Sequence, residues 1–440
     1  MRVRSIRNSR FLWFAVGTTA LFAVLSFFSK LSCTGDAFFD IIGVTRTACY
    51  NDIQAIWFGR GLALHLPPYS GGYDAVTGTL TPGTVEYPTL SGLFIWATAA
   101  FANSDIVFLI ITSVLLGLAA VATTILLARI AGKRVWLWAA APALILYTAY
   151  NWDILPVLCS VAAFTLVLGR ENSDITAKRL ISAGILLGVG GGLKLYPLLF
   201  VVPLVIWILL DADLGHRSRQ WRVRSAIATF GAAAGVVVLS NVPFMIVNFT
   251  GWLAAFQFQS IRAIDASTMS IWYWGLRPFV DTGSESVQHG MMLASTVCTA
   301  LGILAVIAVA VRSGLRRSHV SWLALCAVLL CIYLLFNKVH SPQYILWLLP
   351  FFVLLDIRIR WVLAYYVADL LAFIGWYRWN FYAASGNAER ADIAMTVLTV
   401  GIAVRIVLLV IFMVILPRRS PSKPGQVSEA LESPTHRLAE

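Results

Sequence analysis

A carboxylate, Asp52, lies in the long polar segment that follows the first hydrophobic stretch, and two tyrosines next to prolines, Tyr69 and Tyr87, follow it. An aspartate can act as a general base when a substrate hydroxyl comes within hydrogen-bonding distance. Hydrophobic segments lie on both sides of this region, so the chemistry would take place where lipid meets water. The structural alternative is that Asn51 or Asp52 caps a helix over residues 53–64.

Basic residues later in the chain could bind a phosphate group. Lys194 lies within an apolar, glycine-rich run, GVGGGLKLYPLL, where an ammonium group needs an anionic partner and generally has a function. Its alternative role is to extend toward the membrane surface. Lys338 and His340 lie together in FNKVHSPQY, and Arg262 precedes them in an aromatic-rich segment. Such side chains hold phosphate oxygens by charge-assisted hydrogen bonds.

Six residues are candidates for contacts with a sugar or an acceptor. Glu86 could orient a sugar hydroxyl, or it could be a solvated loop residue. Trp272 could stack on a sugar ring, although an aromatic belt at the membrane interface is the commoner role. Asp153 is interpreted first as a cap for the helix that begins at Ile154. The full candidate set is Tyr69, Glu86, Tyr87, Asp153, Trp272 and Gln343.

The composition is that of a protein with many membrane-spanning segments. Hydrophobic residues make up 59% of the 440 residues and charged residues only 12%, whereas a soluble protein is about a quarter charged. The net charge of +12 could indicate a nucleic-acid partner. However, the basic residues gather in short loops that alternate with loops poor in lysine and arginine, as cytoplasmic loops do. No nucleic-acid partner is therefore expected.

The hydrophobic segments predict an all-α, polytopic membrane protein with about twelve transmembrane helices and both termini in the cytoplasm. The predicted helices are 11–29, 105–129, 135–150, 154–169, 180–195, 197–211, 225–249, 291–311, 320–337, 343–357, 361–376 and 393–416. Asp369 and Arg405 fall within two of these helices and are predicted to pair with each other in a structural role.

The hydrophobic segment 88–102 is a special case. If it crossed the membrane, every later basic loop would lie on the wrong side, so it is predicted to lie along the outer surface as an interfacial or re-entrant helix. It then belongs to a long first outer loop, 30–104, and the candidate residues share the extracytoplasmic face. Residues 1–416 form one transmembrane domain, and residues 417–440 form a disordered cytoplasmic tail rich in proline, serine and charge.

Cysteine spacing and sequence motifs argue against several classes of site. The six cysteines form no CxxC pair, so a zinc or iron–sulfur site is not expected. Cys33 and Cys49 lie in the first outer loop, where they could form a disulfide or remain free thiols. There is no Walker lysine, HExxH or GxSxG motif, which argues against an ATPase or a soluble-type nucleotide-sugar enzyme. No cofactor is predicted, although Asp52 and Asp153 together could bind a divalent metal ion.

The order of several short motifs resembles the GT-C superfamily of membrane glycosyltransferases, and most closely glycosyltransferase family 87, which includes actinobacterial polyprenyl-phosphomannose-dependent mannosyltransferases. The similarity extends over residues 11–416. The motifs are Asn51-Asp52, Pro68-Tyr69, Glu86-Tyr87-Pro88, Lys194-Leu195-Tyr196-Pro197 and Ser341-Pro342-Gln343-Tyr344. Glu86 and Thr89 depart from the family pattern, which often has an aromatic residue and a second proline around the Tyr-Pro step.

This resemblance implies a GT-C-like fold and an inverting hexosyltransferase of the plasma membrane that acts in the synthesis of cell-envelope glycolipids or polysaccharides. Asp52 would be the catalytic base. The groups that would stabilise the departing lipid phosphate are Lys194, Lys338, His340 and Arg262.

The implied partners, besides membrane lipids, are a polyprenyl-phosphate sugar as donor and a glycolipid or glycan as acceptor. Mannose is the first choice of sugar, and arabinose and glucose are alternatives. The alternatives from another class are a lipid-linked substrate transporter or flippase and a non-catalytic envelope scaffold. A transporter should show repeated halves, and the sequence shows no such repeat.

Overall fold

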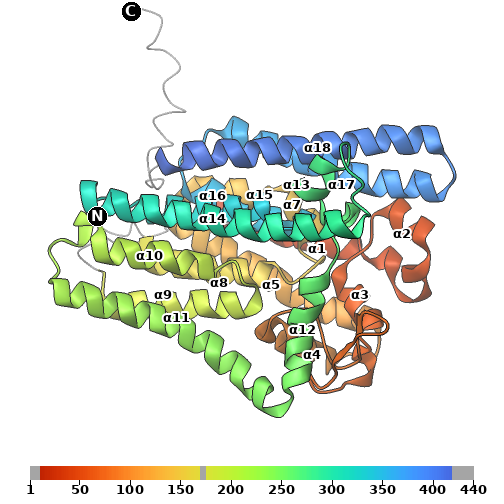
Figure 1. Ribbon diagram of the computed structural model, residues 1–440, viewed down its shortest axis with the longest axis horizontal. Helices are drawn as coiled ribbons and strands as arrows, with labels where there is room; N and C mark the ends of the chain where they lie inside the picture. Colours follow the sequence, from red (N-terminus) through yellow and green to blue (C-terminus); the bar gives the residue numbers. More distant parts are fainter. Residues whose placement is uncertain (1–9, 169–174, 419–440) are drawn as a thin grey trace, which may run out of the picture.

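The computed structural model describes residues 10–168 and 175–418, and within these ranges the chain is mainly helical (Figure 1). The predicted disordered tail lies outside the described residues from 419 onward, as does the last residue of the predicted helix 154–169.

The longer helices run along the long axis of the molecule. They are α1 (Arg10–Phe28), α5 (Asp105–Ala131), α8 (Ile154–Leu168), α9 (Ala177–Leu193), α10 (Leu198–Leu210), α11 (Arg219–Val247), α14 (Glu285–Arg317), α15 (Trp322–Phe336), α16 (Ile345–Leu354), α17 (Ile359–Ala384) and α18 (Ala388–Ile415). The shorter α-helices are α2 (Ile41–Thr47), α3 (Asp52–Gly59), α4 (Thr89–Ala99), α6 (Trp136–Ala139), α7 (Pro142–Tyr147), α12 (Phe249–Ile261) and α13 (Ile271–Leu276).

Single-turn helices and one small hairpin complete the described chain. The 3₁₀ helices are η1 (Leu31–Cys33), η2 (Gly35–Phe39), η3 (Leu62–Leu64), η4 (Gly132–Val135), η6 (Ala212–Leu214), η7 (Ala266–Thr268), η8 (Pro342–Tyr344) and η9 (Leu416–Arg418). Strands β1 (Tyr73–Asp74) and β2 (Thr79–Leu80) pair in antiparallel fashion.

Among the described residues, 6 helical segments are long and apolar enough to cross a membrane, which makes the chain a multi-pass membrane protein. These segments are Arg10–Cys33, Asp105–Ala139, Arg219–Val247, Glu285–Arg317, Ile359–Ala384 and Ala388–Ile415. Shorter apolar helices accompany them. One of these, α16, is buried along its whole length, so protein rather than lipid surrounds it and its 10 residues need not span a bilayer.

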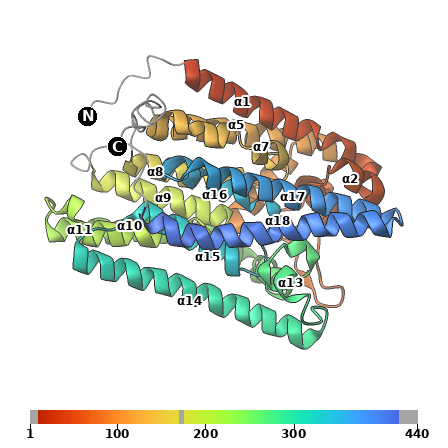
Figure 2. The same cartoon turned by 90° about the horizontal axis from the view of Figure 1, so that it is seen from above.

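The two ends of the bundle differ. Helix α1 begins and α18 ends at the same end of the molecule (Figure 2), while α2, α3, α4 and α12 gather toward the other end (Figure 1). Helix α4 occupies the hydrophobic segment 88–102. Its 11 residues would extend about 16 Å, against roughly 30 Å of hydrocarbon, so α4 is too short to cross a bilayer as a straight helix.

The predicted continuous helix 135–150 is wrong. The chain forms two short helices there, α6 and α7, separated by Ala140 and Ala141, and Pro142 begins α7. A proline ring lacks the backbone donor of a helix interior and blocks the preceding turn, but it fits the first turn of a new helix. The break at Pro142 therefore redirects the chain, which reaches the cavity described below at Tyr150 and Asn151.

Several other helices extend beyond their hydrophobic runs. Helix α11 begins at Arg219, where the Ser218 side chain accepts a hydrogen bond from the Trp221 backbone. Helix α14 likewise begins at Glu285 rather than at 291, and α17 continues to Ala384 rather than ending at 376. Hydropathy marks the apolar part of a helix, whereas capping and tertiary packing decide where it ends.

Close backbone contacts hold neighbouring helices together. A Cβ atom at Gly375 of α17 would lie 2.4 Å from the Leu398 backbone nitrogen of α18, and one at Gly401 would lie 2.5 Å from the Ala372 nitrogen. Within lipid, association depends on such close packing of small residues because the lipid itself is apolar. The predicted pair Asp369–Arg405 is confirmed between the same two helices, with 3.6 Å between its nearest atoms.

We expect Gly401→Val to lower the stability of the purified protein, because the added side chain must displace the backbone of α17. Overpacking typically costs about 1–3 kcal/mol, which a melting curve in detergent micelles would detect as a lower apparent Tm. The matched control is Gly231→Val in α11, where a Cβ atom meets nothing within 4 Å. An equal Tm for the two variants would contradict the close crossing of α17 and α18.

Candidate active site

A cavity of about 820 Å³ lies where the first loop meets the ends of several helices. It is within the range of small-molecule sites, roughly 300–1,000 Å³. Seven of the residues predicted from the sequence line it, namely Asp52, Glu86, Tyr87, Lys194, Arg262, Lys338 and Gln343. The other four, Tyr69, Asp153, Trp272 and His340, are not among the residues that line the cavity.

Asp52 is the first residue of α3, but it does not cap that helix. The cap is Asn51, whose side-chain oxygen accepts a hydrogen bond from the Gln54 backbone at 2.9 Å. The Asp52 backbone N–H donates to the carbonyl of Tyr150 at 2.8 Å. Because Asn51 takes the cap, the Asp52 carboxylate is free to face the cavity.

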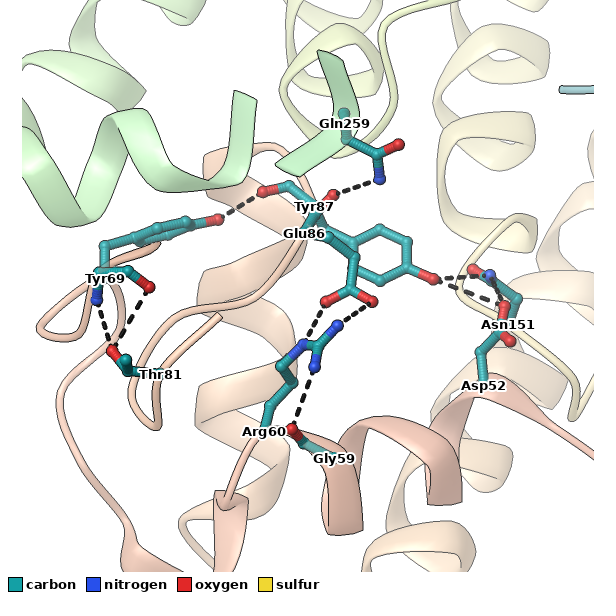
Figure 3. Close-up of polar contacts among 10 residues, drawn as sticks. Asp52, Gly59, Arg60, Tyr69, Thr81, Glu86, Tyr87, Asn151 and Gln259 are labelled. Carbon is teal, nitrogen blue, oxygen red and sulfur yellow. Dashed lines mark hydrogen bonds and ion pairs between the residues drawn. The ribbon is translucent and has the colours of Figure 1, made fainter. Parts of the chain in front are cut away.

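Two donors orient this carboxylate. The Asn151 side-chain amide donates to Asp52 Oδ2 at 2.5 Å and to the Tyr87 hydroxyl at 2.9 Å, and the Tyr87 hydroxyl reaches the same carboxylate oxygen at 3.5 Å. Figure 3 shows the Tyr87 ring extending from its turn toward Asp52 and Asn151. Burial raises the pKa of the Asp52 carboxyl above its usual value, and the Asn151 hydrogen bond and the Lys194 charge oppose that rise. A raised pKa makes the carboxylate a stronger base.

The turn that carries Tyr87 is fixed from three sides (Figure 3). Glu86 binds Arg60 through two contacts, of 2.7 and 3.1 Å, so it is not the solvated loop residue of the structural alternative. Gln259 of α12 donates to the Glu86 carbonyl at 3.0 Å. The buried Tyr69 donates its hydroxyl hydrogen bond to the Tyr87 carbonyl at 2.8 Å, so Tyr69 positions Tyr87 from behind the cavity wall.

Lys194 has the anionic partner that its apolar surroundings require. Its ammonium group lies 2.8 Å from Asp153 Oδ1, which also accepts a hydrogen bond from the indole of Trp347 at 2.8 Å. The interpretation of Asp153 as a helix cap is therefore wrong, because its fully buried carboxylate faces Lys194 and Trp347. Lys194 also lies over the rings of Tyr87 and Tyr344 and reaches the cavity.

Two further cations lie at the C-terminal end of α12. The ammonium of Lys338 donates to the carbonyls of Gln259, Ser260 and Arg262 at 2.7, 3.0 and 3.2 Å. Burial, and then the charge of Arg262, lower the pKa of Lys338. The guanidinium of Arg262 has no hydrogen-bond or ion-pair partner among the described residues and faces the same cavity. Gln343 also lines the cavity, and its buried side-chain oxygen has no hydrogen-bond partner in the described part of the chain.

His340 and Trp272 lie behind the wall. The His340 backbone donates to the Thr268 carbonyl at 2.7 Å, and its buried ring stacks on Tyr344. Burial and the charge of Arg405 lower the pKa of His340 well below its usual value, which favours the neutral ring. The Trp272 indole donates to the Phe336 carbonyl at 2.6 Å. Neither residue is placed to touch a ligand in the cavity.

A disulfide anchors the segment that leads into α3. Cys33 and Cys49 are bridged, with 5.6 Å between their Cα atoms, which replaces the alternative of two free thiols. Gln54, in the first turn of α3, donates to the Cys33 carbonyl at 3.0 Å and to the Asp105 carboxylate at 2.8 Å. These contacts tie the start of α3, and with it the Asp52 backbone, to α5.

Sequence reasoning missed several cavity residues. Arg60 and Asn151 were not assigned a role, although Arg60 is one of the few basic residues in the first loop and Asn151 is two residues from Asp153. Trp376, Tyr377 and Asn380 also line the cavity. The segment from Trp376 to Asp392 was predicted to lie on the outer face, after the helix 361–376, but none of these three residues was singled out as a site residue.

The sequence model of glycosyltransferase family 87 matches residues 85–337, more than half of the chain. The chain belongs to glycosyltransferase family 87. This confirms the resemblance drawn from the short motifs. The matched range includes Glu86, Asn151 and Lys194, while Asp52 precedes it and Lys338 follows it.

Among solved structures, this family 87 chain is similar to the archaeal oligosaccharyltransferase AglB from Archaeoglobus fulgidus, at 14% sequence identity and a TM-score of 0.41. That structure is a complex with an inhibitory peptide and a dolichol-phosphate. The alignment covers 98% of this chain and 59% of the archaeal chain. No curated protein matches the sequence.

Among the described residues of this family 87 chain, there is no group of three or more His, Cys, Asp or Glu side chains that could hold a metal ion. The two acids considered as a metal pair have other partners, because Asp52 binds Asn151 and Asp153 binds Lys194.

We expect Asp153→Ala to destabilise this family 87 protein strongly, because it leaves the Lys194 ammonium in a largely buried position without a counter-charge. Removing one partner of a buried ion pair costs about 3–5 kcal/mol, to be measured by unfolding in mixed micelles. The double variant Asp153→Leu with Lys194→Met removes both charges and should recover part of the loss. If the single variant were as stable as Asp392→Ala, a change at an exposed position of α18, the ion pair would not support the fold.

Proposed function

We propose that this enzyme is an inverting transferase that moves mannose from a polyprenyl-phosphate sugar to a hydroxyl of a glycolipid or glycan acceptor on the extracytoplasmic face. The observation that carries the proposal is the juxtaposition of one oriented carboxylate with several cations in a single cavity. Asp52, Lys194, Arg262 and Lys338 all line it. A base for the acceptor and a positive surface for a leaving phosphate are what this reaction requires.

The placement of basic loops supports the extracytoplasmic orientation. Lys133 and Arg134 follow α5, Arg316 and Arg317 end α14, and Arg358 precedes α17. These helix ends point away from the end at which α2 and α3 gather (Figures 1 and 2). Loops rich in lysine and arginine remain in the cytoplasm, so we place the cavity on the opposite side of the membrane.

A lipid-linked donor suits a cavity at this level of the bundle. A polyprenyl chain cannot leave the bilayer, so its sugar must be transferred where the headgroup meets water. No nucleotide is needed at the site, because the phosphate that leaves is already attached to the lipid.

The reaction follows from the positions of these side chains. Asp52 takes the proton of the acceptor hydroxyl, and the oxygen attacks the anomeric carbon from the side opposite the phosphate. The bond between that carbon and the phosphate oxygen breaks, and the bonding electrons leave with the polyprenyl phosphate. Lys194 and Arg262 balance the negative charge that develops on the leaving group, while Asn151 and Tyr87 hold the base in place before the reaction begins.

We expect Asp52→Asn to reduce transfer by about 10²–10⁴-fold, the usual contribution of a general base, with little change in apparent Tm. The assay uses membranes with equal amounts of each variant, radiolabelled polyprenyl-phosphomannose as donor, and a lipid and glycan extract as acceptor. The matched control is Asp392→Asn, at an exposed position of α18. Undiminished transfer by Asp52→Asn would remove Asp52 from catalysis, and labelled arabinose or glucose donors run in parallel distinguish the sugar.

The rate of transfer should also depend on pH. Because Asp52 acts only as the carboxylate, the rate is full above its pKa and falls as the pH decreases through it. Burial raises that pKa, so the decline should begin at a higher pH than for a free aspartate, whose pKa is about 3.9. Single-turnover rates measured across the acidic range with saturating donor test this. The same decline in the residual activity of Asp52→Asn would assign it to a different group.

A further inference from the structure

The C-terminal part of α17, from Phe373 onward, presents a stripe of side chains to the cavity. Phe373, Trp376, Tyr377 and Asn380 all line it. Their spacing of three, four and seven residues places them on one face of a helix. The rings of Phe373 and Tyr377 lie 4.8 Å apart.

This stripe is part of an uncharged wall, which we call the aromatic wall: the α17 stripe together with Tyr50 and Tyr150. Helix α2 packs against α17 and contributes only uncharged residues to the cavity lining, among them Thr45. The cations instead come from the end of α3, where Arg60 is paired with Glu86, from the ends of α9 and α12, and from the segment after α15. The cavity therefore has a cationic part and an uncharged aromatic part.

Asp52 lies between these two parts. On one side its carboxylate accepts a hydrogen bond from Asn151, and the positive charge of Lys194 stabilises its ionised form. On the other side lies Tyr50, which also lines the cavity and whose ring lies 5.9 Å from that of Tyr150. A base in this position can serve a molecule on the aromatic side that attacks a molecule on the cationic side.

The aromatic wall has the chemistry of a carbohydrate site. Trp376 is half-buried, and its indole N–H has no hydrogen-bond partner among the described residues. Asn380 donates to the Trp376 carbonyl at 2.8 Å, while its side-chain oxygen has no partner within the same ranges. A sugar ring offers an apolar C–H face and a rim of hydroxyl groups, which match an aromatic surface edged by a few polar atoms.

An aromatic belt at the membrane interface is the alternative role for such a stripe, but belt residues face lipid, whereas these residues face the cavity. The length of α17 is consistent with a site that lies outside the hydrocarbon layer, in contact with water. The 26 residues of α17 extend about 39 Å, compared with roughly 30 Å of hydrocarbon. The end of α17 thus reaches beyond the apolar layer.

We propose that the aromatic wall is the acceptor subsite and that it takes the ring of an uncharged sugar, so that the acceptor is a glycan or the sugar headgroup of a glycolipid. This inference rests on the proposed function. The acceptor ring stacks on Trp376, Asn380 and Tyr377 bind its hydroxyl groups, and one remaining hydroxyl points to Asp52. A simple alcohol lacks the ring face that this wall recognises.

The first test measures binding without catalysis. Saturation-transfer NMR on the full-length protein in micelles would use methyl glycosides and trisaccharides of mannose and glucose as probes, and decanol as the acceptor without a ring. We expect transfer of saturation to the sugars, its loss in Trp376→Ala, and its retention in Trp376→Phe, which keeps a ring. The matched control is Trp361→Ala, at the other end of the same helix and outside the cavity lining.

The second test measures transfer kinetics with polyprenyl-phosphomannose. Trp376→Ala should raise the KM for the sugar acceptor by about tenfold, the value of one stacking contact, and should leave the KM for the donor unchanged. A merely structural role would instead lower the amount of active enzyme without separating the two KM values.

The outcomes separate this inference from the proposed function. Sugar binding that depends on Trp376 in a protein that transfers nothing would support the aromatic wall and refute the transferase. The inference is overturned if wild-type protein binds no sugar probe, if Trp376→Ala binds sugars as wild type does, or if decanol is as good an acceptor as the sugars.

Discussion

The ion pair between Asp153 and Lys194 is the interaction on which the rest of the cavity depends. It joins residues at the start of α8 and the end of α9 and is completed by the indole of Trp347 in α16. A charge in such apolar surroundings is tolerated only when it is paired and hydrogen-bonded. The pair therefore fixes the relative positions of three helices and presents a cation to the cavity.

The turn that carries Asp153 also supports the base. Asn151, two residues earlier, binds the Asp52 carboxylate, and the carbonyl of Tyr150 accepts the Asp52 backbone N–H. One short turn thus sets the distance between the carboxylate and the nearest cation. Preorganisation of this kind means that neither group has to reorient when charge moves during a reaction.

The sequence was informative wherever a property is local. Hydropathy located the long helices, and the position of Asp52 in the first loop identified one of the carboxylates that line the cavity. Contacts between side chains that are far apart in the sequence could not be predicted in this way. Nothing local shows that Glu86 meets Arg60, or that Asp153 meets Lys194 rather than capping its own helix. Lys338 and His340 are neighbours in sequence, yet only Lys338 lines the cavity, because the direction of a side chain depends on backbone geometry.

The α17 extension shows a further reason for the limits of sequence reasoning. Its last turns, WYRWNFYAA, mix tryptophan and tyrosine with arginine and asparagine, so the hydropathy signal fades although the helix continues. The stripe that faces the cavity lies mostly in these turns. A functional surface at the edge of a membrane contains both polar and apolar residues. A search for continuous hydrophobic segments therefore does not detect it.

The bridge between Cys33 and Cys49 has a consequence for the biogenesis of the protein. Disulfides form and persist in oxidising compartments and are rare in the cytoplasm. In the proposed orientation, the covalent link that anchors the start of α3 can close only after the first loop has been exported. Until then, the disulfide does not hold the start of α3, so the Asp52 carboxylate is not yet fixed in its final position. Assembly of the site would therefore be coupled to translocation of the first loop across the membrane.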